Sequence, residues 1–143
     1  MAACSYTTNF VVVNSSDKPI EVRYKIKKSS DPNLTAQTLP VRPGLKPISE
    51  VHKQVAWRDL SDSEFSIDLS SRTVVVMLTP GNALRVEHRN LVDGETDDAH
   101  QAENFSIEEI DILGANGEIH LKGDAARKSF VPESKSVYTL TYK

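Results

Sequence analysis

The feature that most constrains this chain is a two-residue alternation of apolar and polar side chains. Between Ile20 and Lys27, the apolar residues Ile20, Val22, Tyr24 and Ile26 alternate with charged ones. Successive side chains of a β-strand point to opposite faces, so this pattern is typical of a strand with one buried and one solvated face. Three more segments repeat it: Glu64–Ser70, Ala83–Arg89 and Val137–Tyr142. The chain is therefore expected to be all-β.

Other segments refine this expectation. The runs Phe10–Val13 and Val74–Leu78 are apolar on both faces, which favours central strands that are covered on both sides. In Ala83–Arg89 the alternation directs Leu84 and Val86 inward and Glu87 outward, and it places His88 on the inward face. The stretch Ser49–Leu60 fits both a helical stripe and a strand face, and the surrounding strands favour a strand. Asp124–Lys128 is compatible with one helical turn.

Turn residues separate these segments, as in Gly114–Gly117, where Asn116-Gly117 favours a tight hairpin. About eight or nine strands at such spacing indicate a sandwich or a barrel. We expect a two-sheet antiparallel sandwich of immunoglobulin-like or fibronectin-like architecture. It would form a single domain over residues 6–143, after a flexible N-terminus at residues 1–5. A chain of 143 residues is long enough to bury the core that such a domain needs.

Composition excludes several classes of protein. With 38% hydrophobic and 26% charged residues, the chain is not typical of a disordered protein. The longest apolar run, Val74–Leu78, is far shorter than the roughly 20 residues of a spanning helix, so no transmembrane segment is expected. A net charge of −3 argues against nucleic-acid binding. The basic residues Arg23, Lys25, Lys27 and Lys28 lack an interleaved phenylalanine or tryptophan, and we interpret them as protection of a sheet edge.

Residues 91–121 are unusual because they carry nine carboxylates and neither lysine nor arginine. The simpler interpretation is that these carboxylates lie on solvated faces and pair with basic neighbours across strands. The alternative is a Ca²⁺ site, since hard cations prefer several oxygen ligands on a flexible loop. Its candidate ligands are Asp93, Glu95, Asp97 and Asp98. The segment lacks the glycine and glutamate positions of an EF-hand loop, and no other cofactor is indicated.

The N-terminal residues Ala2-Ala3-Cys4 have the small-residue pattern that precedes a lipidated cysteine in bacterial lipoproteins. If Cys4 carried a lipid, it would anchor the domain in a bacterial cell envelope or periplasm. Without this modification Cys4 is an incidental thiol near a frayed end, and a cytoplasmic location is favoured. Because Cys4 is the single cysteine, no internal disulfide can form.

Sequence motifs do not identify an enzyme. The chain has no nucleophile elbow, and its histidines do not have zinc-ligand spacing. Trp57 is interpreted as a core anchor, with an exposed platform for sugar or protein as the alternative. The favoured hypothesis is a non-enzymatic binding or structural module that contacts a protein partner or glycan through loops 29–47 and 93–104. The alternative is a Ca²⁺-dependent carbohydrate-binding module or a hydrolase that uses the acidic 93–104 loop.

Overall fold

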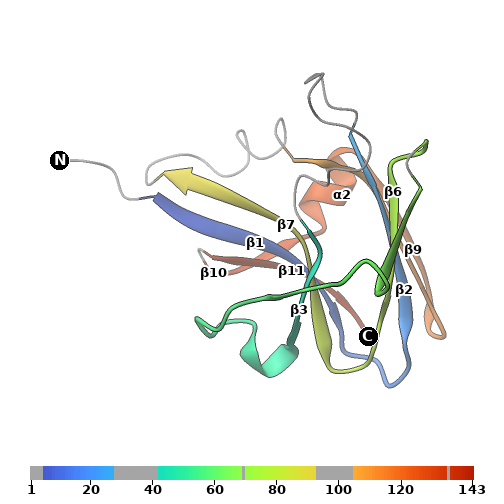
Figure 1. The fold of residues 1–143 in the computed structure, drawn as a ribbon, viewed down its shortest axis with the longest axis horizontal. Coiled ribbons are helices and arrows are strands. Elements are labelled where there is room, and N and C mark those ends of the chain that lie inside the picture. The colour runs from blue at the N-terminus through green and yellow to red at the C-terminus, as the bar shows by residue number, and fades with distance from the viewer. Residues whose placement is uncertain (1–4, 28–41, 69, 93–104, 135) are drawn as a thin grey trace.

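The computed structural model describes residues 5–27, 42–68, 70–92, 105–134 and 136–143. They form a sandwich of two β-sheets (Figure 1). Sheet A has the strand order β10 (Val131–Ser134), β11 (Val137–Tyr142), β1 (Ser5–Asn14), β7 (Asn82–Val92), β3 (Gly44–Pro47) and β4 (Arg58–Asp59). Sheet B has the order β5 (Phe65–Asp68), β6 (Thr73–Leu78), β2 (Ile20–Ile26), β8 (Ile107–Gly114) and β9 (Gly117–Lys122). Neighbouring strands are antiparallel except β1 and β11, which are parallel.

The predicted two-sheet sandwich is confirmed, but its strand number was underestimated. The described residues contain eleven strands rather than eight or nine. The short strands β3, β4 and β10 have only four, two and four residues. Strands this short do not show enough alternation to be recognised in a sequence.

An aromatic cluster fills one end of the space between the sheets. The Phe10 ring centroid lies 5.0 Å from that of Phe105, 5.7 Å from Phe130 and 5.2 Å from Tyr138. Phe130 follows the short helix α2 (Asp124–Lys128), which lies at this end of the sandwich (Figure 1) and confirms the predicted helical turn. The buried Arg127 guanidinium sits 5.0 Å from the ring centroids of Phe10 and Tyr138. Helix α2 therefore closes the core with both apolar and cation–π contacts.

A β-bulge in β7 overturns the expected orientation of two residues. Phe10 pairs with Glu87 and Val11 with Arg85, so Val86 is the extra residue. Val86 and Glu87 are consequently both buried, at 3% and 2% exposure. The Glu87 carboxylate accepts the backbone N–H of Ser106 at 3.0 Å. His88, expected to face inward, is exposed because the bulge reverses the alternation after Val86.

The outer faces of the two sheets differ. Val11 and Val13 of β1 are buried in a second apolar cluster outside sheet A, so the prediction that Phe10–Val13 is covered on both faces is correct. The same prediction for Val74–Leu78 is wrong, since Met77 is 58% exposed on the outer face of sheet B. The described part of the chain supplies a covering layer only for sheet A, and this layer creates the cavity described below.

The charged outer face of sheet B explains the basic and acidic segments. Strand β2 is the middle strand of its sheet, so its basic residues do not protect an edge as expected. In register, Arg23 lies opposite Asp111 and Lys25 opposite Glu109 of β8. Close ion pairs within this sheet include Arg23–Glu21 at 2.7 Å and Lys122–Glu109 at 3.6 Å. For the described residues, the acids of 91–121 thus lie beside basic neighbours, as the simpler interpretation predicted.

The predicted hairpin from β8 to β9 forms, with Ala115 and Asn116 as its turn residues and Gly117 as the first residue of β9. The C-terminal strand holds this hairpin. The Tyr142 hydroxyl accepts the Asn116 N–H at 2.9 Å and donates to the Gly117 carbonyl at 2.8 Å. Tyr142 belongs to sheet A, whereas the hairpin belongs to sheet B. Its hydroxyl therefore joins the two sheets at the end of the sandwich opposite α2.

Candidate functional site

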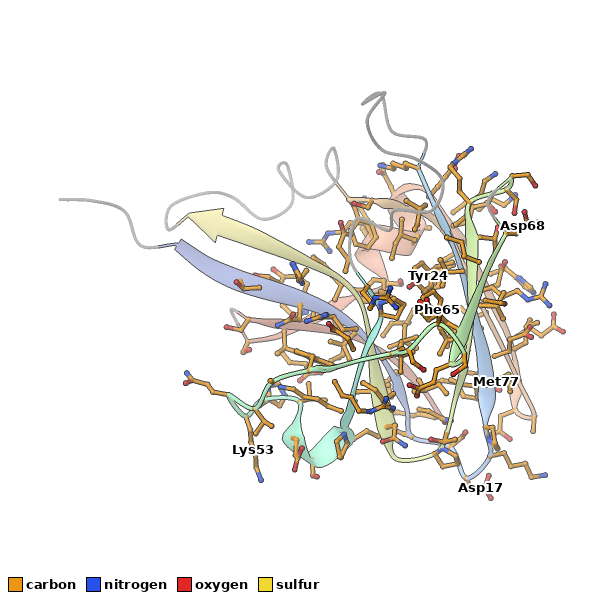
Figure 2. The ribbon with its side chains drawn as sticks, viewed as in Figure 1. Asp17, Tyr24, Lys53, Phe65, Asp68 and Met77 are labelled. Atoms are coloured by element: carbon orange, nitrogen blue, oxygen red, sulfur yellow. The ribbon has the colours of Figure 1, made fainter. Side chains whose placement is uncertain are left out.

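A cavity of about 550 Å³ lies on the outer face of sheet A. Its floor includes Thr7 and Asn9 of β1 and Val137 of β11. Residues 51–57, which we call the cover segment, form the wall opposite this floor. Figure 1 shows the η1 turn (Ile48–Glu50) and the chain that follows it beside β3, and Figure 2 places Lys53 there, away from Tyr24 and Phe65. The cavity is thus separate from the core between the sheets.

Two features of the sequence bring the cover segment to this face. Strand β3 pairs with β7, and Pro47 then ends the strand because proline cannot extend the ladder. The chain turns through η1, where the Ile48 N–H donates to the Gly81 carbonyl at 2.9 Å. Val51 is then buried against Val11 and Val13, which anchors the cover segment over the sheet. The expectation that Ser49–Leu60 is a strand is therefore wrong except at Arg58–Asp59.

Lys46 is the buried cation of this cavity. Its register partner is Ala83, which belongs to the outer cluster, so Lys46 projects from the outer face of sheet A. The residue is 4% exposed, and its Nζ donates to the Lys53 carbonyl at 3.1 Å. Nζ also lies 4.8 Å from the centroid of the Trp57 ring. Desolvation lowers the pKa of Lys46, Glu50 nearby opposes this change, and Arg85 adds to it.

Trp57, the last residue of the cover segment, is partly buried and packs against the outer cluster. The Arg85 guanidinium carbon lies 5.7 Å from its ring centroid, so the ring contacts two cations. A Cβ on Gly44 would come within 3.1 Å of the Trp57 Cβ and 3.3 Å of the Arg85 guanidinium carbon. Glycine at position 44 therefore permits this close packing. Trp57 is an anchor, as expected, but of the outer cluster rather than of the core.

The polar residues that line the cavity are either cationic or uncharged. Lys46, His52 and Lys53 carry or can carry positive charge, and Thr7, Asn9 and Ser136 add donors and acceptors. No aspartate or glutamate lines the cavity among the residues that the structure describes. The cavity can therefore accommodate a small group that accepts hydrogen bonds or carries negative charge.

Sequence reasoning did not identify this cavity, although Lys46 lies within the expected contact loop 29–47. Nothing in Gly44-Leu45-Lys46-Pro47 marks the lysine as buried, because its burial comes from the returning cover segment. The candidate Ca²⁺ ligands Asp93, Glu95, Asp97 and Asp98 lie outside the described residues, as does Cys4. Within residues 5–27, 42–68, 70–92, 105–134 and 136–143, no group of three His, Cys, Asp or Glu side chains could hold a metal ion. None of the helices described there is long and apolar enough to cross a bilayer.

His120, on the outer face of sheet B, is exposed and lies between two carboxylates. Its Nδ1 is 2.7 Å from Asp111 Oδ1, and its Nε2 is 2.9 Å from Glu118 Oε2. The hydrogen bond to Glu118 raises the pKa of His120 most, and the hydrogen bond to Asp111 raises it further. By contrast, partial desolvation together with Arg85 lowers the pKa of His88.

The two histidines are expected to titrate in opposite directions from the ordinary value of about 6.5. Imidazole NMR signals recorded against pH measure both pKa values. The His120 contacts stabilise the fold below the unfolded-state pKa, and this contribution is lost as pH rises through the higher folded-state pKa. Glu118→Gln should lower the pKa of His120 and leave that of His88 unchanged. An unchanged pKa of His120 in Glu118→Gln would show that the pairing is not formed in solution.

Comparisons of this chain with protein-family models, curated proteins and solved structures find no match. The function of the cavity therefore has to follow from its own residues.

Proposed function

We propose that the protein is a non-enzymatic binding module of immunoglobulin-like or fibronectin-like architecture, and that its ligand site is the cavity between sheet A and the cover segment. The observation that carries this proposal is a cavity of about 550 Å³ that is lined by cationic and neutral polar residues. Its volume is within the range of small-molecule sites. One wall is a paired sheet and the other is fixed to it by Val51. Such a site is largely formed before a ligand arrives, which reduces the entropic cost of binding.

The polar groups of the cavity support the same proposal. A buried charge is costly unless other groups compensate it, and a single carbonyl and an indole ring compensate Lys46 only in part. A ligand that supplied further acceptors would offset more of this cost. Lys46 belongs to the segment 29–47 that was expected to be a contact loop, although residues 44–47 of that segment form strand β3.

Fragment screening by NMR tests the proposal, with acids, amines, amides and sugars as separate classes. We expect at least one class to shift the backbone amide signals of Lys53, Gln54 and Ser136 together. It should also change the emission of Trp57, the single tryptophan of the chain. Ligands that bind elsewhere would leave both signals unchanged.

A blocking variant provides the control. Ser136 is exposed and lines the cavity, so Ser136→Tyr should occupy part of it and weaken fragment binding. Ser66→Tyr makes the same change on an exposed position of β5 in sheet B and should leave binding unaffected. If no class of fragment perturbs the cavity signals of the folded protein, the proposed function is wrong.

A further inference from the structure

We propose that the cavity binds a carboxylate group, held by the Lys46 ammonium beneath the cover segment. This inference rests on the proposed function, because it assumes that the cavity is the ligand site. It adds the chemical class of the ligand and the residue that selects it.

The Lys46 ammonium has more hydrogen-bond donors than its described partners use. An ammonium group carries three N–H donors. Among the described residues, Nζ donates one hydrogen bond, to the Lys53 carbonyl at 3.1 Å. It makes a second, non-directional contact with the Trp57 ring at 4.8 Å. No described carboxylate lies within 4.0 Å of this ammonium, whereas Arg23, Arg58 and Arg85 each have such a partner. Lys46 can therefore donate to a ligand.

The side chains that line the cavity beside Lys46 are cationic or neutral. His52 and Lys53 line the same cavity, and the described lining contains no acidic side chain; Glu50 lies near Lys46 but does not line the cavity. Because the Lys46 side chain is buried, an anion beside its ammonium is attracted more strongly than it would be beside a fully exposed lysine. A bound anion would also oppose the desolvation that lowers the pKa of Lys46. A cationic ligand would meet repulsion here.

Among anions, the lining of the cavity favours a carboxylate over a phosphate. Phosphate sites typically use arginine forks or the N-terminal N–H groups of a helix. No arginine lines the cavity in the part of the chain that the structure describes. One ammonium together with hydroxyl and amide groups such as Ser136 and Asn9 matches the single charge of a carboxylate better. The carboxylate could belong to a small organic acid or to an acidic peptide, since both present the same group.

Titration of the full chain with four probes tests the inference: acetate, acetamide, inorganic phosphate and a blocked tripeptide with a central aspartate. Trp57 emission and the amide signals of Lys53 and Ser136 report binding. Acetate and acetamide have nearly the same shape and differ in charge. We expect acetate to bind at least about tenfold more tightly than acetamide, because a hydrogen bond between charged groups is the stronger kind. This comparison needs no variant, so it does not depend on how a variant folds.

Variants then test the role of Lys46. Lys46→Met keeps the length of the side chain without its charge and should weaken acetate binding at least about tenfold. Lys46→Arg should retain more of the affinity than Lys46→Met. Lys18→Met makes the matched change in an exposed turn and should leave the affinity unchanged. Thermal unfolding of each variant verifies that it is folded.

The outcomes separate the two proposals. Tighter binding of the peptide would identify a protein segment as the source of the carboxylate, and equal binding of acetate and peptide would identify a small acid; both support the inference. Acetamide or phosphate binding in the cavity more tightly than acetate would overturn the inference and leave the proposed function standing. Equal acetate affinity in Lys46→Met and the unchanged protein would also overturn it. If nothing binds in the cavity, both proposals fail.

Discussion

Replacement of Phe10 by alanine is expected to lower the free energy of unfolding by about 3–5 kcal/mol. The Phe10 side chain is fully buried, and its ring contacts Phe105, Phe130 and Tyr138. Truncation leaves a cavity where these residues meet, and it removes one ring beneath the Arg127 guanidinium. Because folded domains are stable by only about 5–15 kcal/mol, this loss is a large fraction of the total. Urea unfolding curves measure this loss of stability, because the midpoint should move to a lower urea concentration while the slope stays constant.

Two further variants show whether the effect comes from packing. Phe10→Leu keeps more of the volume and should cost less than Phe10→Ala. Met77→Ala removes a large apolar side chain that is 58% exposed on sheet B, and it should change stability by no more than about 0.5 kcal/mol. Similar losses in Phe10→Ala and Met77→Ala would contradict the position of the aromatic cluster.

Replacement of Gly114 by alanine is expected to destabilise the protein by about 3 kcal/mol, at the upper end of the cost of overpacking. An added Cβ would lie 2.5 Å from the Tyr142 hydroxyl oxygen, 2.6 Å from its Cζ and 2.8 Å from the Ile20 Cγ2. Tyr142 cannot withdraw easily, because it is 4% exposed and its hydroxyl makes two hydrogen bonds to the hairpin. Position 114 therefore requires glycine, because Tyr142 and Ile20 leave no space for a Cβ.

A double-mutant cycle isolates this contact. Tyr142→Leu removes the hydroxyl and the ring carbon that an alanine at position 114 would meet. In that background, Gly114→Ala should cost markedly less than it does alone, as measured by the same urea unfolding curves. Additive effects of the two changes would show that the hairpin and Tyr142 are not in contact.

Most of the fold could be predicted because its signals are local. The alternation in Ile20–Ile26 depends only on which faces of β2 are wet, and the structure reproduces it. The orientation of Glu87 could not be predicted in this way. One inserted residue in β7 reverses the orientation of Glu87 and His88, and the insertion is visible only through the register with β1.

The cavity was missed for a related reason. Lys46 is buried because the chain returns over it after η1 and places Trp57 and the Lys53 carbonyl beside its ammonium. Each of these residues is ordinary by itself, and their proximity depends on the pairing of β3 with β7. The acidic segment stands out in the sequence because its composition is unusual. Composition along the chain identifies groups of like residues, whereas a binding site usually combines unlike residues from several elements.

The parallel pairing of β1 with β11 has a consequence for the order of assembly. Asn9 and Ser136, which are joined by a backbone hydrogen bond, are 127 positions apart. During synthesis from the N-terminus, one side of β1 has to wait for its partner until the last strand has emerged. Contacts between such distant residues form slowly, because a long loop must be closed before they contribute. Until then the nascent chain exposes a hydrogen-bonding edge in the middle of the future sheet A, and this edge is where association between unfinished chains would begin.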